Sequence, residues 1–299
     1  MSGNFWHLCR HGNLIKCFRL EGFLQEVNIS YEDCTLPCWH DICLGVGRLG
    51  VKGYMLANGA AGNFALSQVS RRDLPVVLAS KMDGATTVSA TMLLAAAAGI
   101  SIFVTGGIGG VHRGGEASMD ISADLTELSR TPVAVVCAGA KSVLDIPRTL
   151  EFLETQGVCV AVMGSDEFPA FFTPHSGCRA PCRIDSPEQA ASMLLAAGQV
   201  QGLHNSGMLL CCPIPEQFAA EGQQIESAIS AALDEATAQG IAGSEVTPFL
   251  LERIRSLTGG ASLVANIKLV MNNAAIGAQM AKSYVHQKKH NSCQGRSRL

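Results

Sequence analysis

The sequence has little charge for its length and no marked excess of either sign. Only 16% of its 299 residues are Asp, Glu, Lys or Arg, and the formal net charge is −3. Such a balance provides no general electrostatic attraction to nucleic acid or to anionic lipid. We therefore expect a small-molecule ligand rather than a nucleic-acid or membrane partner, with any affinity for phosphate confined to a local site.

Long hydrophobic runs are also missing. The longest apolar stretch, around residues 92–103, is shorter and more interrupted than the roughly 20 residues that cross a bilayer. Nothing near the N-terminus resembles a signal peptide. Since 47% of the residues are hydrophobic, the chain can bury a large core. These features predict a soluble, cytoplasmic protein with a single large domain.

Cysteine is abundant, but paired C-x-x-C knuckles with a matching second half are absent. Without support for secretion, most of the twelve cysteines are expected to be free thiols. The nearest approach to a metal cluster is formed by Cys34, Cys38, His40 and Cys43. Its spacing is not that of a structural zinc site.

From Asp73 onward, apolar stretches alternate with helical patterns. The stretches that we expect to be buried strands are residues 74–80, 101–107, 131–141 and 158–164. The intervening helices are expected at residues 84–100, 121–130 and 142–157. Two further helices should begin at Ser186-Pro187 and at Thr247-Pro248. Helical segments are also expected at residues 225–239 and 262–281. This alternation predicts an α/β fold with a mostly parallel central sheet and helices on both faces.

A glycine-rich segment follows the second expected strand. We call residues 105–115, TGGIGGVHRGG, the glycine loop. It lacks the last glycine of a dinucleotide fingerprint and the Gly-Lys-Ser/Thr of a phosphate-binding P-loop. One interpretation is a solvent-exposed connector whose glycines serve only turn geometry. The polar side chains of His112, Arg113 and Glu116 favour a ligand site, in which free backbone N–H groups could hold a phosphate.

Two acidic residues and a serine come next. Ser122 is suited to cap a helix, and Asp124 to occupy its first turn. Asp120 lies before that helix and is not needed as its cap. It could instead offer a hard oxygen ligand to Mg²⁺ or Mn²⁺.

Lys141 ends the third expected strand, at CAGAK. Burial and the start of the following helix would both favour its neutral amine, which is a candidate to form an imine with a sugar carbonyl. The alternative is an ordinary surface lysine at a turn.

Seven blocks of sequence resemble the pseudouridine-5'-phosphate glycosidase family, within a match that runs from about residue 68 to residue 281. They are ASKMDGATTVSATM, FVTGGIGGVHRG, DISADL, VVCAGAKSVLDIPRTLEFLET, PIPEQF, EVTPFLLERI and LTGGASLVANIKLVMNNA. The resemblance implies an enzyme that reversibly cleaves the C–C glycosidic bond of pseudouridine 5'-phosphate, giving uracil and ribose 5-phosphate. It also implies a lysine imine, a divalent cation that is generally Mn²⁺, and a homotrimer.

The resemblance assigns roles to individual residues. Lys141 matches the family's nucleophile, and Asp120 matches its metal position. The positions that it implies for substrate binding are Val88, Thr105, Ser122, Ala123, Asp124 and Asn266. His112 lies beside them and is included as a candidate for substrate binding.

The sequence also departs from the family. No residue in 1–66 aligns with the glutamate that donates a proton, and Glu21, Glu26 and Glu32 stay unassigned. Gln68 stands where a substrate-binding lysine is usual, and Cys212 where an asparagine is usual. We therefore divide the chain into an atypical region (1–66), a glycosidase-like domain (67–284) and a basic flexible tail (285–299).

These departures leave other functions open. A catalytically impaired protein that binds a phosphosugar or a partner would keep the fold without the proton donor. An imine-forming aldolase acting on another sugar phosphate is a third possibility. The last three residues, Ser297, Arg298 and Leu299, resemble a peroxisomal import signal, which makes the peroxisome the alternative location.

Overall fold

A computed structural model describes residues 6–8, 14–16, 53–54, 68–80, 84–200, 205–241, 246–259 and 261–296. The N-terminal group of Cys34, Cys38, His40 and Cys43 lies outside these residues. So do the three unassigned glutamates and the last three residues of the chain.

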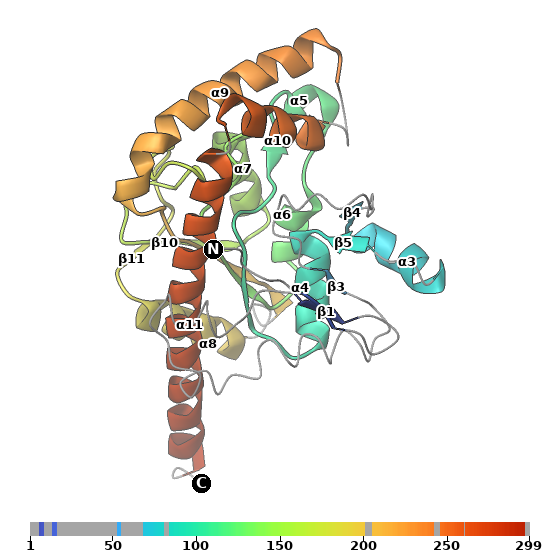
Figure 1. Ribbon diagram of the computed structural model, residues 1–299. Helices are drawn as coiled ribbons and strands as arrows, with labels where there is room; N and C mark the ends of the chain where they lie inside the picture. The colour runs from blue at the N-terminus through green and yellow to red at the C-terminus, as the bar shows by residue number, and fades with distance from the viewer. Residues whose placement is uncertain are drawn as a thin grey trace.

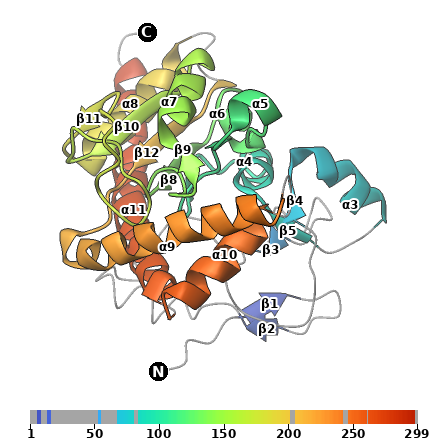
Figure 2. The ribbon, with the colours of Figure 1, turned by 90° about the horizontal axis from the view of Figure 1, so that it is seen from above.

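The centre of the fold is a sheet of five parallel strands, as the sequence predicts (Figures 1 and 2). Its order is β11-β10-β12-β8-β6, so β8 lies between β12 and β6. The strands are β6 (Ile102–Val104), β8 (Ala134–Cys137), β10 (Cys159–Met163), β11 (Arg183–Ile184) and β12 (Met208–Cys211).

Helices cover both faces of this sheet, which explains why β8 is apolar throughout. Ala134 and Val136 point to a layer built from α8 (Pro187–Gln199) and α11 (Ala261–Arg296). Val135 and Cys137 point to the opposite layer. That layer includes α4 (Val88–Ala97), α6 (Ala123–Leu128) and α7 (Ile146–Thr155). The two-residue period of a strand therefore places alternate side chains in separate cores.

Two predicted helix starts are confirmed. Ser186 caps α8 by accepting a hydrogen bond from Gln189 N, and Pro187 follows at the first helical position. Ser122 caps α6 by accepting from Asp124 N at 3.3 Å.

The prediction of a buried strand over residues 74–80 is wrong. This stretch forms α3 (Leu74–Ser80), which follows a 3₁₀ turn, η1 (Arg71–Asp73). Ser70 N donates to Asp73 Oδ2 at 2.8 Å, and this capping interaction starts the helical turns. The apolar residues are not all buried, since Val76 is 61% exposed and Leu78 is 42% exposed. Local capping has outweighed strand propensity here.

A small parallel sheet precedes the main sheet in the sequence. This small sheet has the order β3-β5-β4 and consists of β3 (Gly53–Tyr54), β4 (Gln68–Val69) and β5 (Gly84–Thr86). The remaining short elements are β1 (Trp6–Leu8), β2 (Leu14–Lys16), β7 (Val111–His112), α5 (Gly115–Ser118), β9 (Leu144–Asp145) and η3 (Glu216–Phe218).

The C-terminal part is helical and includes α9 (Ala219–Ala238), α10 (Val246–Leu257) and α11. In Figure 1, α11 passes beside α8 toward the end of the chain. It continues to Arg296, so residues 285–296 are helical rather than the flexible tail that the sequence predicts. Hydrogen bonds from the side chain of Gln287 to residues of α8 help to hold this end of α11 in place. Among the described residues, no helix has the length and apolarity needed to cross a membrane.

Candidate active site

The glycine loop and the segment that ends in Lys141 are joined by backbone hydrogen bonds. They follow β6 and β8, which are parallel neighbours. Ala138 N donates to Gly106 O (2.8 Å), Ile108 N to Gly139 O (3.1 Å) and Lys141 N to Ile108 O (3.2 Å). Lys141 and the loop therefore meet at the carboxyl edge of the sheet, where open parallel sheets place their ligands.

The glycine loop is packed into the protein and is not a solvent-exposed connector. Ile108 and Val111 are buried in the main core. A Cβ atom at Gly109 would collide with the Ser122 side chain, so this position requires glycine. Since the amides of Ile108, Gly109, Val111 and His112 all bond to protein acceptors, a phosphate would have to be held by other amides of the loop.

Asp124 is a buried link between the loop and α4. Its Oδ2 accepts a hydrogen bond from Gly109 N, and its Oδ1 accepts one from Ser89 N, each at 2.8 Å. Ser89 directly follows Val88, the first residue of α4. The carboxylate thereby fixes the positions of Val88 and the loop relative to each other.

His112 and Asp120 lie on two paired segments at the rim of this cluster. His112 N donates to Asp120 O (3.0 Å), and Ser122 N donates to Gly110 O (3.0 Å). The Nδ1 atom of His112 is 3.7 Å from Oδ2 of Asp120, and the two side chains are 20% and 39% exposed. Ala123 then begins α6. Both side chains are accessible to a ligand.

Lys141 is half-buried, but it does not lie at a helix start as the sequence predicts. Residues 142–145 first form a turn and β9, which pairs with β7. Helix α7 begins only at Ile146, with Asp145 as its cap. Leu144, whose N–H donates to Lys141 O at 3.0 Å, pairs with His112. The turn therefore connects Lys141 with the pair formed by His112 and Asp120.

Two asparagines of α11 lie against the start of the glycine loop. A Cβ atom at Gly106 would lie 3.2 Å from Asn266 Oδ1, so the predicted Asn266 adjoins the loop. Asn273, which is not among the predicted site residues, is buried and donates through Nδ2 to Thr105 O (2.9 Å) and Gly106 O (3.3 Å). An asparagine on an apolar helix face was the sequence feature that could have revealed it.

A second segment that the sequence analysis missed forms a wall beside Lys141. Phe171 N donates to Ala138 O at 3.0 Å, and Ser142 Oγ donates to Ala170 O at 2.5 Å. Phe171 has a φ of +63° and packs its ring on Gly107. A left-handed phenylalanine is strained and is held by its surroundings. The cluster FPAFF soon after β10, at the same sheet edge, was the available clue.

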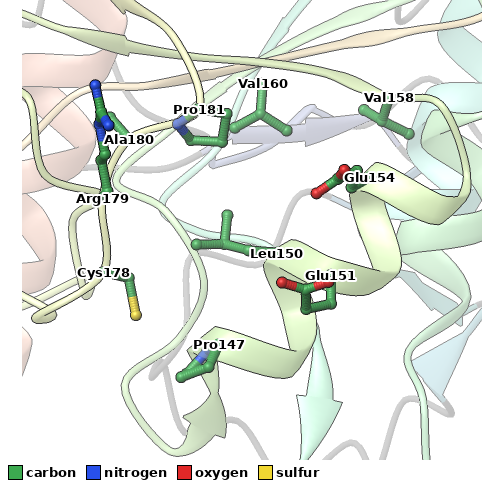
Figure 3. Close-up of a pocket in the computed structure, with 10 residues that line it drawn as sticks. All are labelled: Pro147, Leu150, Glu151, Glu154, Val158, Val160, Cys178, Arg179, Ala180 and Pro181. Carbon is green, nitrogen blue, oxygen red and sulfur yellow. The ribbon is translucent and has the colours of Figure 1, made fainter.

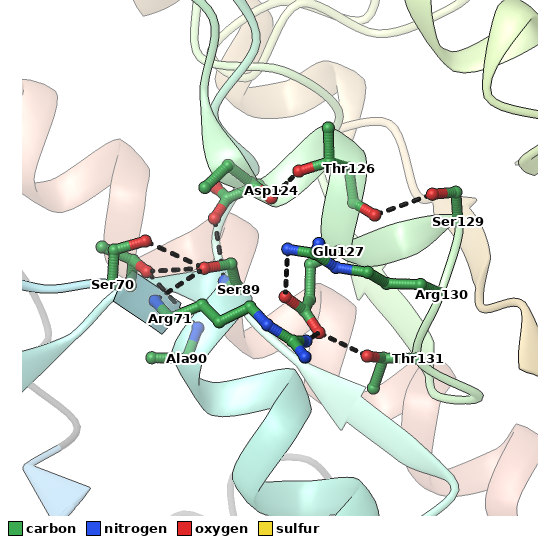
Figure 4. A network of polar contacts seen from close by, with 12 residues as sticks. Ser70, Arg71, Ser89, Ala90, Asp124, Thr126, Glu127, Ser129, Arg130 and Thr131 are labelled. Atoms are coloured by element: carbon green, nitrogen blue, oxygen red, sulfur yellow. Dashed lines mark hydrogen bonds and ion pairs between the residues drawn. The ribbon is translucent and has the colours of Figure 1, made fainter. Parts of the chain in front are cut away.

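Glu127, which lies on α6 with Asp124, is the buried centre of a polar network (Figure 4). Its side chain is 0% exposed, with Oε1 at 2.6 Å from Arg71 Nη1 and Oε2 at 3.2 Å from Arg130 Nη2. Thr131 also donates its hydroxyl hydrogen bond to this carboxylate. Because a buried carboxylate needs such partners, the network fixes η1 against α6.

The two substitutions relative to the family lie in different surroundings. The backbone of Gln68 lies in β4 and pairs with Ala85 of β5. Cys212 is buried directly after β12, and its N–H donates to Cys137 O at 2.7 Å. Burial raises the pKa of the Cys212 thiol, and the neighbouring Cys137 adds to the effect. Cys212 is therefore a neutral core residue in this structure.

A hollow of about 620 Å³ lies apart from this cluster, between α7 and the segment before β11 (Figure 3). Its lining combines apolar side chains with Glu151, Glu154 and Arg179. None of the residues that the sequence predicts for the site lines it.

Comparisons with known proteins agree with the resemblance. The profile of the family described as "Indigoidine synthase A like protein" matches residues 23–283. The chain is 50% identical to a pseudouridine-5'-phosphate glycosidase of Arabidopsis thaliana over 254 residues, covering 85% of this chain and 76% of that protein. It is also 50% identical to one of Chloroflexus aurantiacus over 268 residues, covering 87% and 85% of the two chains.

A solved structure is similar in fold and sequence. The prealnumycin C-glycosynthase AlnA, in complex with ribulose 5-phosphate, superposes with a TM-score of 0.73 and 32% identity. The alignment covers 86% of this chain and 90% of that one.

The family profile begins much earlier than the boundary predicted at residue 66. It includes Glu26 and Glu32 and leaves out Glu21. The match toward the N-terminus is therefore longer than the blocks of similar sequence indicate.

Proposed function

Because the chain belongs to the pseudouridine-5'-phosphate glycosidase family, we propose that it reversibly cleaves pseudouridine 5'-phosphate to uracil and ribose 5-phosphate. The observation that carries this proposal is the 50% identity to curated glycosidases over most of both chains. The cleaved bond joins two carbon atoms, so protonation of a glycosidic oxygen cannot release the base as in ordinary glycoside hydrolysis. The anomeric carbon needs a group that supplies an electron pair as uracil leaves.

Lys141 is the proposed source of that pair. Its neutral amine bonds to the anomeric carbon as the bond from this carbon to the ring oxygen breaks, and the nitrogen lone pair then forms the imine C=N as the bond to uracil breaks, leaving the bonding pair on the uracil carbon. The uracil carbon gains a proton, and water then hydrolyses the imine to release ribose 5-phosphate and free Lys141. The backbone bonds to the glycine loop support this role, because they hold the lysine at the ligand-binding edge of the sheet.

Asp120 is the proposed ligand of a divalent cation, with His112 beside it. Their partly exposed side chains fit an ion that keeps several water or substrate ligands, as Mg²⁺ and Mn²⁺ do with carboxylate oxygens. Within the described ranges, no group of three or more His, Cys, Asp or Glu side chains could enclose a metal. The bound ion would supply positive charge near the phosphosugar.

The other predicted residues would bind or position the substrate. We propose contacts from Val88, Thr105, Ser122, Ala123 and Asn266. Asp124 has both carboxylate oxygens engaged by backbone amides, so we infer that it acts by positioning Ser89 and Gly109. That AlnA was solved in complex with ribulose 5-phosphate supports a pentose phosphate as the ligand of this chain.

A homo-oligomer is part of the proposal, a trimer by family resemblance. Val264 and Ile267 are exposed on successive turns of α11, and Leu257 is exposed at the end of α10. Such apolar side chains are suited to an interface between subunits. Light scattering coupled to size exclusion would measure the mass directly.

The second candidate is a phosphosugar-binding protein with impaired catalysis. Gln68 favours impaired catalysis, because a neutral glutamine stands where the family usually has a lysine that binds the substrate.

Borohydride trapping tests these alternatives. The protein is incubated with ribose 5-phosphate and sodium borohydride, and its peptides are mapped by mass spectrometry. We expect a reduced adduct on Lys141 and, without borohydride, formation of pseudouridine 5'-phosphate when uracil is added. Binding without an adduct would favour the non-catalytic protein, and an adduct without uracil-dependent product would favour an aldolase.

A further inference from the structure

Two histidines lie together on α11, away from the proposed catalytic residues. His286 and His290 are four residues apart, so they occupy the same face of the helix. Both side chains are exposed. Their Nε2 atoms are 3.2 Å apart and their ring centroids 4.4 Å apart.

The separation of the two nitrogens matches that of ligands on one metal ion. Zinc binds imidazole nitrogen at about 2.0–2.1 Å in tetrahedral geometry, which places two nitrogens roughly 3.3 Å apart. Imidazole is a preferred ligand of zinc, copper and nickel, and two histidines at this helical spacing are a recurring zinc-binding arrangement.

The helical turn that carries the pair is anchored. Gln287, between the two histidines in sequence, donates through Nε2 to Glu188 O (3.1 Å) and accepts from Ser192 Oγ (3.0 Å). These bonds fix the turn against α8, so little backbone freedom is lost when an ion binds. Lys288 has its Nζ atom 5.5 Å from the centre of the Tyr284 ring, on nearly the opposite side of the helix from both histidines.

We propose that His286 and His290 form a surface site for a divalent transition-metal ion of the zinc type. Each neutral imidazole contributes its Nε2 lone pair, and water occupies the remaining coordination positions. The site is independent of Asp120 and of the proposed enzymatic activity.

A zinc titration of the full-length protein tests this proposal. Isothermal calorimetry with ZnCl₂ is performed on the wild type, His286→Ala and His290→Ala. Because binding by two linked ligands exceeds binding by one, we expect each substitution to weaken one zinc site by about 100-fold. His175→Ala is the matched control, since His175 is exposed and lies outside the pair. It should retain the site.

Hydrogen exchange supplies a second readout. Zinc should slow exchange of the backbone amides at residues 286–290 in the wild type and in His175→Ala, and in neither variant of the pair. Loss of the site in both pair variants together with this protection pattern supports the proposal. Unchanged zinc affinity in His286→Ala and His290→Ala, or equal protection in all variants, would overturn it.

Discussion

The carboxyl edge of β6 and β8 and the hollow beside α7 differ in what they bring together. The hollow offers about 620 Å³ of space, but its polar side chains come from one helix and one neighbouring segment. At the sheet edge, a lysine, a histidine, two aspartates and two asparagines arrive from distant parts of the sequence. Because fixed polar groups converge at the sheet edge and not at the hollow, we place the proposed reaction at the sheet edge in spite of the hollow's volume.

The largest expected effect is at Lys141. Lys141→Ala should lower turnover of pseudouridine 5'-phosphate by about 10³-fold or more, because the substitution removes the amine that forms the proposed imine. Circular dichroism should show an unchanged fold. Lys289→Ala, which removes an exposed lysine of α11, is the control and should be fully active. Substantial activity in Lys141→Ala would contradict the proposed mechanism.

Metal dependence comes next. Chelation should remove activity and Mn²⁺ should restore it, whereas Asp120→Asn should weaken Mn²⁺ binding by about 100-fold, since an amide is a poorer ligand than a carboxylate. Asp166→Asn changes an exposed aspartate outside the cluster and should have no effect. Unaltered Mn²⁺ affinity in Asp120→Asn would exclude this residue from the site.

The stabilising role of the Glu127 network can be tested separately from the proposed catalytic chemistry. Arg71→Met removes a charged partner of the buried Glu127 and should lower the free energy of unfolding by about 1.5–3 kcal/mol, measured in urea. Arg72→Met is a matched control, because Arg72 is 88% exposed and bonds only weakly to Asp73. Equal destabilisation by both substitutions would show that the Glu127 network has no special role.

Restoring the family's charge at residue 68 should improve substrate binding. Gln68→Lys adds a charge-assisted hydrogen bond to phosphate, on the order of 1–3 kcal/mol, and should lower KM roughly 5-fold or more. Pseudouridine without its phosphate is the control substrate, whose KM should not change. An unchanged or higher KM for the phosphorylated substrate would mean that residue 68 does not contact phosphate.

The smallest effect is expected at the hollow. Glu151→Gln and Leu150→Ala should leave kcat/KM within about twofold of the wild type, since neither residue contacts the proposed site. A loss comparable to that of Lys141→Ala would reverse the comparison and place the chemistry in the hollow.

The sequence predicts the parallel sheet and places Lys141 at the carboxyl edge of a strand, because apolar runs and their ends are local patterns, but β8 ends at Cys137 and no helix starts at Lys141. The secondary structure predicted from the sequence is wrong where contacts between residues outweigh local propensity. Residues 74–80 are apolar enough for a strand, yet the bond between Ser70 and Asp73 starts a helix. Residues 142–145 look helical, but β9 pairs first with β7 and delays α7. The wall at Phe171 and the anchor at Asn273 depend on long-range packing, so the FPAFF cluster and the asparagine mark unusual positions without showing what they contact.

Backbone bonding of the glycine loop also determines which sequence changes the loop can accept. Its path is fixed by main-chain groups of residues 106–112, which pair with residues 138–141 on one side and residues 120–122 on the other. Replacement of an outward side chain leaves those pairings in place, whereas insertion or deletion of one residue shifts both of them at once. The loop is thus far more sensitive to its length than to the identity of its exposed side chains, and variants that change its length should lose the alignment of Lys141 with Asp120.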